Sequence, residues 1–439
     1  MEVISKANES LLAILRKPKS VDGKYRKLHF CVEKPVEEGV LLYNVLTKEL
    51  LLLTQEEYEN YLELDYLREH YFVVPEGNDD QEMADLVRWV LSTRQQQGKE
   101  ILGYTIFTTT DCNARCFYCF ELGGSRIPMS HETALQVVQY IKNHCGGKAV
   151  KLTWFGGEPL YNLDAIDTIC VGLQKEGIPY TSSMVTNAYL FDADVVQKAL
   201  ELWNLEWVQV AMDGTEEVYN RIKAYIYKEG NAYQRVMHNI GLLLDASVSV
   251  SVRMNMDLNN AQNLLELAQD LARHYGGREK LSVNVHYLFQ GNEALADTYS
   301  REEWHLRNEA MCRIEDCLMQ NGLAGSSGVP KKIRLCHCMA DGGNAVTILP
   351  DGSIGLCEHH TESEFIGHIN REGFDEEVVK SWKETVPAIA ECATCFYYPD
   401  CIMLKKCSNV SRCFPEHRSR QFRKLLRRME NEFRKWQSN

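Results

Sequence analysis

Six short apolar stretches alternate with amphipathic stretches between residues 98 and 325. Branched and aromatic residues predict strands at YTIFTT, AVKLTWF, YTSSMV, WVQVAM, VSVSVRMNM and LSVNVHYL. Helical periodicity separates them, as in ETALQVVQYIKNH, ADVVQKALELW and AQNLLELAQDLARHY. Such β/α units predict a parallel sheet covered by helices. Since a closed barrel of this type has about eight units, we expect an α/β fold with an open, partial (β/α)6 TIM-like barrel.

The flanking regions have different patterns. Residues 1–97 contain the strand-like segments KLHFCVE, GVLLYNVLT, ELLLLT and YFVVPE. A capping box at Thr54 and Glu57 begins a helical stretch over YENYLELDYLREH, and a second helix is expected over DQEMADLVRWVLSTRQQQ. This predicts a small winged-helix-like module. Residues 326–439 have little apolar periodicity and form the third expected domain.

The composition and charge of the chain exclude some classes of partner and location. With 45% hydrophobic residues the chain is globular. The absence of an apolar run of about 18 residues and the polar N-terminus MEVISKANESLLAILRKPKS predict no membrane partner and a cytoplasmic location. A net charge of −13 disfavours a nucleic-acid partner. Residues 416–439 nevertheless carry eight Lys/Arg against three Glu, which predicts a basic amphipathic helix docked on an acidic surface.

Sixteen cysteines are many for a chain expected in the cytosol. Because cytosolic thiols stay reduced, clusters of cysteine there indicate metal binding or catalysis. Three cysteines lie at 112–119 and eight at 336–413. The remaining five are expected to pack as small buried hydrophobes: Cys31, Cys145, Cys170, Cys312 and Cys317.

The segment DCNARCFYCFE contains Cys112, Cys116 and Cys119 at the spacing C-x3-C-x2-C. Three thiolates suit an iron–sulfur cluster, a zinc site with a fourth ligand from elsewhere, or structural thiols. The segment directly follows the first barrel strand. The segments GGEP (156–159), TN (186–187) and DG (213–214) follow the next three strands. Strand ends form the catalytic rim of such barrels.

This motif, with Tyr118 before the last cysteine, resembles the signature of radical S-adenosylmethionine (SAM) enzymes, and FGGEP and MDG resemble the SAM-contacting segments of that family. The resemblance implies a 4Fe–4S cluster on Cys112, Cys116 and Cys119, with SAM on its open iron. It also implies that Gly156, Gly157, Glu158 and Pro159 line the methionine amino group, that Tyr118 lies against adenine, and that Thr186, Asn187 and Asp213 lie near the ribose or the substrate.

The C-terminal cysteines resemble a SPASM domain, the auxiliary-cluster module of peptide-modifying radical SAM enzymes, although Cys392-x2-Cys395 alone would also suit a zinc ribbon. The resemblance implies two further 4Fe–4S clusters. The outer one would use Cys392, Cys395, Cys401 and Cys413, and the inner one Cys336, Cys338, Cys357 and Cys407. Cys407 lies farther from Cys401 than in the family pattern. Cys336 and Cys338 are so close in sequence that the inner cluster would have an open iron if only one of them reaches it.

Glu358 and Asp213 are the candidate catalytic residues. Glu358 follows Cys357, and an acidic residue there is similar to the proton acceptor proposed in sulfatase-maturing relatives. A carboxylate in this place can accept a proton from an oxidised substrate. The alternatives are a surface glutamate at 358 and an ordinary turn at Asp213-Gly214.

Residues 1–97 look like the peptide-recognition element of maturases of ribosomally synthesised peptides (RiPPs), with a structural cap on the barrel as the alternative. We therefore expect a leader peptide on this module and the core peptide in the barrel, with flavodoxin or ferredoxin as electron donor. The expected product is a cysteine thioether crosslink. A carbon–carbon or other side-chain crosslink, sulfatase-type oxidation of Cys or Ser, and a zinc scaffold without catalysis are the alternatives.

Overall fold

The barrel region is built on parallel strands, as a computed structural model shows. It describes all residues except 16–22, 96–99, 122–123, 289–298, 326–327, 360–363, 408–412 and 439. Every one of the six predicted strands is present, and neighbours in sequence are neighbours in the sheet. They are β7 (Gly103–Thr109), β8 (Val150–Gly156), β9 (Tyr180–Thr186), β10 (Leu205–Ala211), β11 (Ser249–Met256) and β12 (Leu281–Tyr287), and each pairs in parallel with the next.

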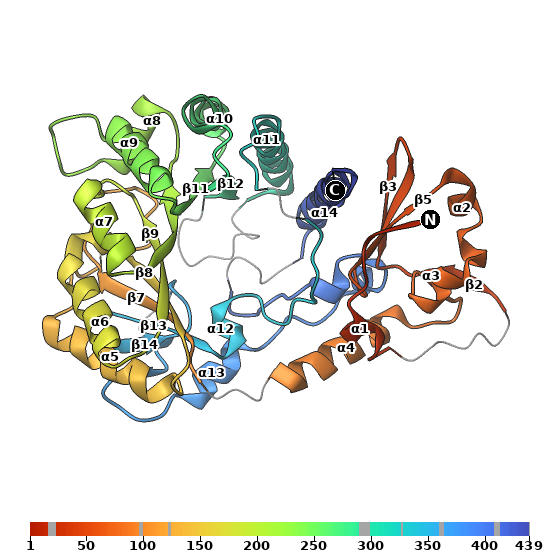
Figure 1. The fold of residues 1–439 in the computed structure, drawn as a ribbon, viewed down its shortest axis with the longest axis horizontal. Coiled ribbons are helices and arrows are strands. Elements are labelled where there is room, and N and C mark those ends of the chain that lie inside the picture. The colour runs from red at the N-terminus through yellow and green to blue at the C-terminus, as the bar shows by residue number, and fades with distance from the viewer. Residues whose placement is uncertain are drawn as a thin grey trace.

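Helices cover the outer face of this sheet (Figure 1). On β11 the side chains of Val252 and Met254 join the buried core with these helices. Because side chains alternate along a strand, Arg253 and Asn255 point toward the barrel interior. The helices are α5 (His131–His144), α6 (Leu163–Lys175), α7 (Ala193–Glu201), α8 (Glu216–Lys223), α9 (Ala232–Asp245), α10 (Ala261–Tyr275) and α11 (Arg301–Gln320).

The third region contributes to the same sheet, which the sequence pattern did not predict. β13 (Ala345–Ile348) pairs in parallel with β7, and β14 (Ser353–Gly355) and β15 (Gly367–His368) follow as antiparallel strands. Strands of two to four residues give no periodic signal of their own, and these depend on β7 for their pairing. The resulting nine-stranded sheet has β12 and β15 at its two edges, so the predicted parallel, open barrel is confirmed.

The N-terminal region forms a separate antiparallel sheet in the order β1 (Glu2–Ser5), β5 (Glu49–Leu53), β4 (Gly39–Asn44) and β3 (Cys31–Val36). A second pair joins β2 (Tyr25–Lys27) to β6 (Val73–Pro75). The two central strands of the larger sheet, β4 and β5, are nearly all buried on both faces, whereas the edge strands β1 and β3 are buried only in part. Its helices are α1 (Glu9–Leu12), α2 (Gln55–Glu59), α3 (Asp65–Glu69) and α4 (Asp80–Gln95).

Two features of this module were predicted from the sequence, a capping box and the helix that it begins. The capping box between Thr54 and Glu57 is present at the start of α2. The prediction of a single helix over YENYLELDYLREH is wrong. Asn60 ends α2, a 3-10 turn follows at Tyr61–Glu63, and extended backbone at Leu64 precedes α3.

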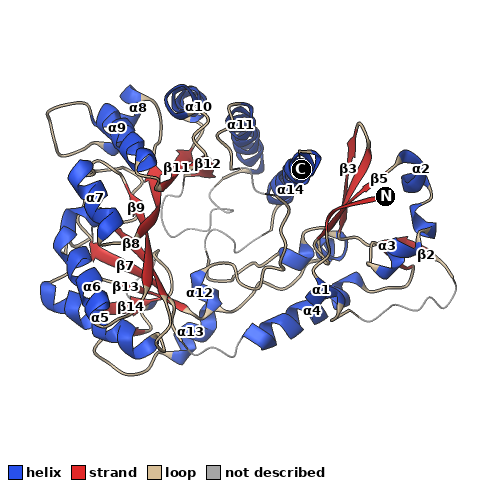
Figure 2. Cartoon of the chain, in the orientation of Figure 1, coloured by secondary structure: helices blue, strands red, loops and turns tan. Residues whose placement is uncertain are grey.

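The C-terminal helix α14 (Pro415–Gln437) lies between the barrel and the N-terminal sheet (Figure 1). Its basic face docks on acidic α11, as predicted: Arg420 and Arg427 each pair with Glu315. The opposite face packs Met429 and Phe433 into the N-terminal core. Figure 2 shows that much of the chain between these two bodies is loop, interrupted by α12 (Met339–Gly342) and α13 (Glu376–Trp382).

Residue 97 and residue 326, where we expected domain boundaries, lie outside the described residues, so the boundaries stay predictions. Across the described part of the chain, none of the helices is long and apolar enough to cross a membrane. None of the sixteen cysteines, all of which are among the described residues, is part of a disulfide. Of the five expected in cores, Cys31, Cys145, Cys170 and Cys312 are buried and Cys317 is half-buried.

Candidate functional site

The loop after β7 brings the first three cysteines into one site. All three are half-buried. Burial and then the charge of Glu158 raise the pKa of the Cys112 thiol to about 12, and Cys116 and Cys119 add to the rise. Burial also raises the pKa of Cys116, while nearby Lys223 opposes this. Bound metal ions would supply the positive charge that three adjacent thiolates need.

A buried polar network holds this loop. The Asp213 carboxylate is fully buried; it accepts a hydrogen bond from the Tyr118 hydroxyl at 2.5 Å and one from the Asn255 side-chain amide at 2.9 Å. The Lys223 ammonium lies 2.9 Å from the same carboxylate and also donates to Tyr118 at 2.9 Å. Burial alone would lower the pKa of Lys223, but Asp213 raises it well above its usual value. The network ties the cysteine loop to the ends of α8, β10 and β11.

Glu158 connects the ends of β8 and β9. Its fully buried carboxylate accepts hydrogen bonds from the Thr186 hydroxyl at 2.7 Å, the Asn187 backbone N–H at 2.8 Å and the Leu160 N–H at 3.2 Å. Burial raises its pKa to about 7 although these donors oppose the rise. The Asn187 side chain reaches back to the cysteine loop by donating to Asn113 at 2.7 Å. Glu158, Thr186 and Asn187 therefore lie together, with the carboxylate directed into the protein.

The two glycines before Glu158 allow strands β7 and β8 to end in close contact. Gly156 has a φ of +128°, and a Cβ there would lie 2.2 Å from the Thr109 carbonyl oxygen. A Cβ on Gly157 would lie 2.3 Å from the Asp111 carbonyl oxygen. Pro159 begins the next 3-10 turn and accepts a hydrogen bond from Thr108 at 2.9 Å. The GGEP segment therefore shapes the rim by its backbone, because no side chain fits at the glycines.

Three functional candidates were missed in the sequence: Lys223, Asn255 and Arg253. Arg253 donates to the Asn255 side-chain oxygen at 3.0 Å. Burial lowers the pKa of Arg253, and the charges of Tyr118, Asp213 and then Glu358 oppose this. Arg253 is therefore near both the first cysteine site and half-buried Glu358. The available signal was the polar alternation within VSVRMNM, where a fully buried strand would be apolar throughout.

Three of the inner C-terminal cysteines, Cys338, Cys357 and Cys407, lie near one another. Burial raises the pKa of Cys338 to about 11, and Glu358 and Cys407 contribute to the rise. Burial and Glu358 likewise raise the pKa of Cys357, which is also near Cys338 and Cys407. Asp341 and Arg334 act on the Cys336 thiol, and Asp341 acts on Cys338 as well. Cys338, Cys357 and Cys407 therefore lie near one another, and the four-ligand inner site stays a prediction.

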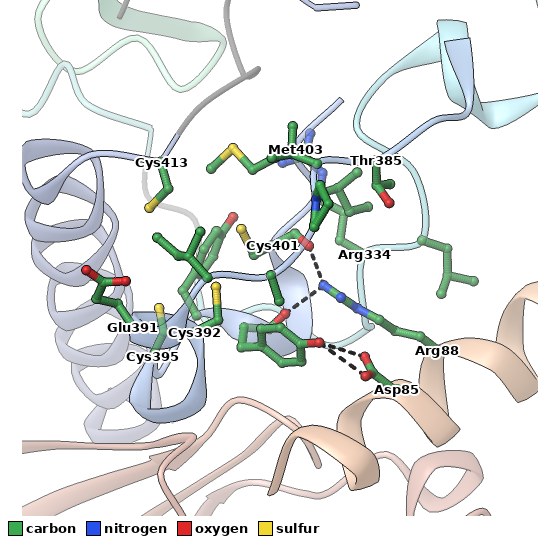
Figure 3. Close-up of a pocket in the computed structure, with 18 of the residues that line it drawn as sticks. Asp85, Arg88, Arg334, Thr385, Glu391, Cys392, Cys395, Cys401, Met403 and Cys413 are labelled. Atoms are coloured by element: carbon green, nitrogen blue, oxygen red, sulfur yellow. Dashed lines mark hydrogen bonds between the residues drawn. The ribbon is translucent and has the colours of Figure 1, made fainter. Parts of the chain in front are cut away.

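The outer cysteines line one cavity of about 820 Å³, shown in Figure 3. Burial raises the pKa of Cys401 to about 11, and Cys413, Cys395 and Cys392 add to it. Cys413 lies just before α14, whereas the other three come from the 3-10 turns at Ala390–Thr394 and Tyr398–Asp400 and the residues after them.

The barrel region is similar to a known protein family. Residues 106–271 match the model of the radical SAM superfamily. The chain contains a radical SAM domain. Such a domain binds SAM and a 4Fe–4S cluster. The matched range includes the cysteine loop, the GGEP segment and Asp213, so the structure and the family signature coincide on the same rim.

Sequence relatives of the radical SAM domain carry GTP 3′,8-cyclase names. A probable GTP 3′,8-cyclase of Methanosarcina mazei is 26% identical over 194 residues, which is 42% of this chain and 55% of that protein. The GTP 3′,8-cyclase of Clostridium perfringens is 25% identical over 281 residues, 61% of this chain and 83% of that protein. The chain thus spans little more than half the length of the first relative.

Solved structures share the fold over more of the chain. The anSMEcpe structure with bound AdoMet and Cp18Cys peptide has a TM-score of 0.56 at 17% identity, covering 77% of this chain and 98% of that one. Streptococcus suis SuiB bound to precursor peptide SuiA has a TM-score of 0.51 at 11% identity, covering 86% and 94%. At these identities the likeness establishes the fold.

The residues on the radical SAM rim fit the cofactors of the family. Three thiols share one loop, and each thiolate of an iron–sulfur cluster binds a different iron, so the thiols need not converge on one ion. Among the described residues, no three His, Cys, Asp or Glu side chains are placed to hold a single metal ion. A cavity of about 220 Å³ beside the loop is lined by Tyr118 and Asp213.

Proposed function

We propose that this protein is a radical SAM maturase that installs an intramolecular crosslink in a ribosomally synthesised precursor peptide. The new bond that we propose is a thioether from a cysteine sulfur to a carbon. The observation that carries the proposal is the combination of a radical SAM domain with two further groups of thiols and an N-terminal antiparallel module. The fold likeness to SuiB bound to a precursor peptide, over 86% of this chain, supports it.

In this proposal Cys112, Cys116 and Cys119 hold the first 4Fe–4S cluster, which with SAM supplies a 5′-deoxyadenosyl radical. The backbone of the GGEP segment lines the SAM amino group, while Tyr118 contributes to the adenine site. Arg253 provides a guanidinium suited to the SAM carboxylate. Thr186 and Asn187 keep this rim in place, because Glu158 binds both and Asn187 binds the cysteine loop.

Two auxiliary clusters complete the proposed cofactor set. The outer thiols share a cavity that has room for a cluster, with four ligands available. For the inner cluster we propose Cys338, Cys357 and Cys407 as ligands. Cys336 is not part of this proposed set, which consists of the three thiols whose charges act on one another. An iron with no protein ligand would then be available to a substrate thiolate.

Thioether formation breaks one C–H and one S–H bond. One hydrogen atom leaves with the deoxyadenosyl radical as 5′-deoxyadenosine, and the other leaves as a proton and an electron, which an auxiliary cluster would accept. We propose Glu358 as the proton acceptor, because it is half-buried next to the inner thiols. Asp213 is less suited, since both of its oxygens are already hydrogen-bonded in a fully buried network. We assign Asp213 a positioning role.

The leader peptide would add a strand to the N-terminal sheet. Edge strands present unpaired backbone groups to an extended peptide. β3 and β1 are the edges, and β3 is longer and pairs with β4 without a register shift, whereas β1 pairs irregularly with β5. The core peptide would enter the open side of the barrel. A flavodoxin or ferredoxin in the cytoplasm would supply electrons.

The test uses anaerobically purified, iron-reconstituted protein with SAM, dithionite and a candidate precursor. We expect 5′-deoxyadenosine and a peptide that has lost two hydrogens per crosslink, with the yield dependent on the leader. A leaderless core peptide is the matched control. GTP in place of peptide tests the activity named in the sequence relatives. Conversion of GTP, or oxidation of a single Cys or Ser without a crosslink, would contradict the proposal.

A further inference from the structure

The turn that carries Cys401 is held by the N-terminal module rather than by the barrel. Arg88 on α4 donates from its Nε to the Pro399 carbonyl oxygen at 3.0 Å and from Nη2 to the Tyr398 carbonyl oxygen at 2.6 Å. The same Nη2 also donates to the carbonyl oxygen of Cys401. Figure 3 shows the bonds from Arg88 to the Tyr398 and Cys401 carbonyl oxygens beside the cysteines of the outer site.

A second set of contacts fixes the same turn. Asp85 accepts a hydrogen bond from the Tyr398 hydroxyl at 2.9 Å. Lys48, fully buried at the turn between β4 and β5, pairs with Asp400 at 2.5 Å. Asp400 in turn accepts from the Arg334 backbone N–H at 3.1 Å. Carbonyls, a ring and a carboxylate of one short turn are therefore all bound by N-terminal side chains.

Arg88 also places a permanent positive charge at the outer thiols. Its guanidinium donates to the carbonyl oxygen of Cys401 and lines the same cavity as the four outer thiols. An iron–sulfur cluster with four thiolates gains one more negative charge when it is reduced. A nearby cation favours the more negative state, and in a partly buried site the effect is weakly screened.

We propose that the N-terminal module is part of the outer iron–sulfur site, with Arg88 as a positioning residue that raises the reduction potential of the outer cluster. The inference rests on the proposed function, because it requires that the outer thiols hold a cluster. The guanidinium is suited to this role, since its rigid fork can bind several carbonyls at once. Lysine keeps the charge and loses that fork.

The experiment compares reconstituted wild-type protein with Arg88→Gln, Arg88→Lys and Arg68→Gln. Arg68 is the matched control, because it also binds a backbone carbonyl, that of Leu62, at 2.8 Å and lies 4.5 Å from the ring centre of Tyr25 in the same module. Iron per chain and electron paramagnetic resonance during redox titration are the measurements. A Cys395→Ala variant identifies the outer signal as the one that disappears.

For Arg88→Gln we expect the equilibrium constant for reduction of the outer cluster to fall about tenfold, which is about 59 mV for a one-electron couple. The other two signals should not move. Arg88→Lys should keep the potential and lose outer iron faster to a chelator. Arg68→Gln should match the wild type in both measurements. If Arg88→Gln does not fold, Arg88→Lys against wild type still tests the positioning role by the rate of iron loss.

Two results would overturn the inference. The first is an outer potential and iron content in Arg88→Gln equal to the wild type, and the second is the same potential shift in Arg68→Gln. A wild-type protein with iron for the first cluster alone would instead refute the auxiliary clusters of the proposed function. The failure of the inference and the failure of the function are therefore distinguishable.

Discussion

The two cysteine sites that are most completely grouped are built in opposite ways. The loop at 112–119 follows a parallel strand and is held by buried polar side chains from α8, β10 and β11. The outer cysteines at 392–413 lie on 3-10 turns and loops, and α4 of another module binds the turn among them. The barrel site is thus formed by one sheet, whereas the outer site is assembled from distant parts of the chain.

This difference has a physical consequence. Parallel strands bring their carboxyl ends to one edge, so barrel packing alone gathers the rim residues. Loops without regular pairing have no such constraint and depend on side-chain contacts or bound metal for their order. We therefore expect the first site to tolerate loss of metal and the outer site to depend on metal and on the N-terminal module.

The largest effect is expected on the reaction, because the two sites should be needed for different steps. Cys116→Ala should abolish formation of 5′-deoxyadenosine, because the first cluster is lost. Cys395→Ala should leave 5′-deoxyadenosine formation in place and abolish the crosslinked peptide. Chromatography of the nucleoside and mass spectrometry of the peptide check both outcomes. Cys170→Ala, in the barrel core, is the control and should retain both products; equal loss in all three variants would contradict the division of roles.

The polar network under the barrel site should contribute several kcal/mol. Lys223→Met leaves the buried Asp213 carboxylate without its cation, which costs about 3 to 5 kcal/mol. Urea denaturation followed by circular dichroism measures the free energy of unfolding. Lys198→Met is the matched control, since Lys198 pairs with Asp167 at 2.9 Å but is 45% exposed; it should cost less than about 1 kcal/mol. Equal costs would show that the network does not hold the site.

Glu158 should make the stability of the barrel depend on pH. Its pKa of about 7 is above the ordinary value of 4.5, so the folded state binds the proton more tightly than the unfolded state. The contribution of Glu158 to the free energy of unfolding is therefore fully present below about pH 4.5. It is lost as the pH rises to about 7, and the loss is at most about 3 kcal/mol. Glu158→Gln does not titrate there. The difference in unfolding free energy between the two proteins, measured from pH 5 to 8, should change by about 1 to 3 kcal/mol; a constant difference would refute the assignment.

The smallest effect is expected at the surface of the C-terminal region. Lys405 and Glu384 pair at 3.0 Å with both side chains about half exposed. Lys405→Ala should change the free energy of unfolding by less than about 0.5 kcal/mol and leave the iron content unchanged. A loss of iron in this variant would show that surface pairs, rather than the thiols and the contacts of Arg88, order the outer site.

Much of the barrel was predictable because its signals are local. Each of the strands β7 to β12 is a run of branched and aromatic residues, and the polar segments after β7 to β10 do meet at one rim. The cysteine spacing at 112–119 likewise identified its site without knowledge of any distant residue. For the inner cysteines, the assignment of Cys336, Cys338, Cys357 and Cys407 to one cluster stays a prediction.

Local sequence was enough to predict the type of each strong element and to locate the cysteine groups, since periodicity and spacing are properties of neighbouring residues. Tertiary packing then brings together the distant residues that complete the sites. Lys223 contacts Tyr118 and Asp213 only in the packed fold. The same holds for the pairing of β13 with β7 and for the hydrogen bond from Arg88 to Cys401. Their own segments carry no sign of these partners, because long-range contacts arise from the way that the helices and sheets pack together.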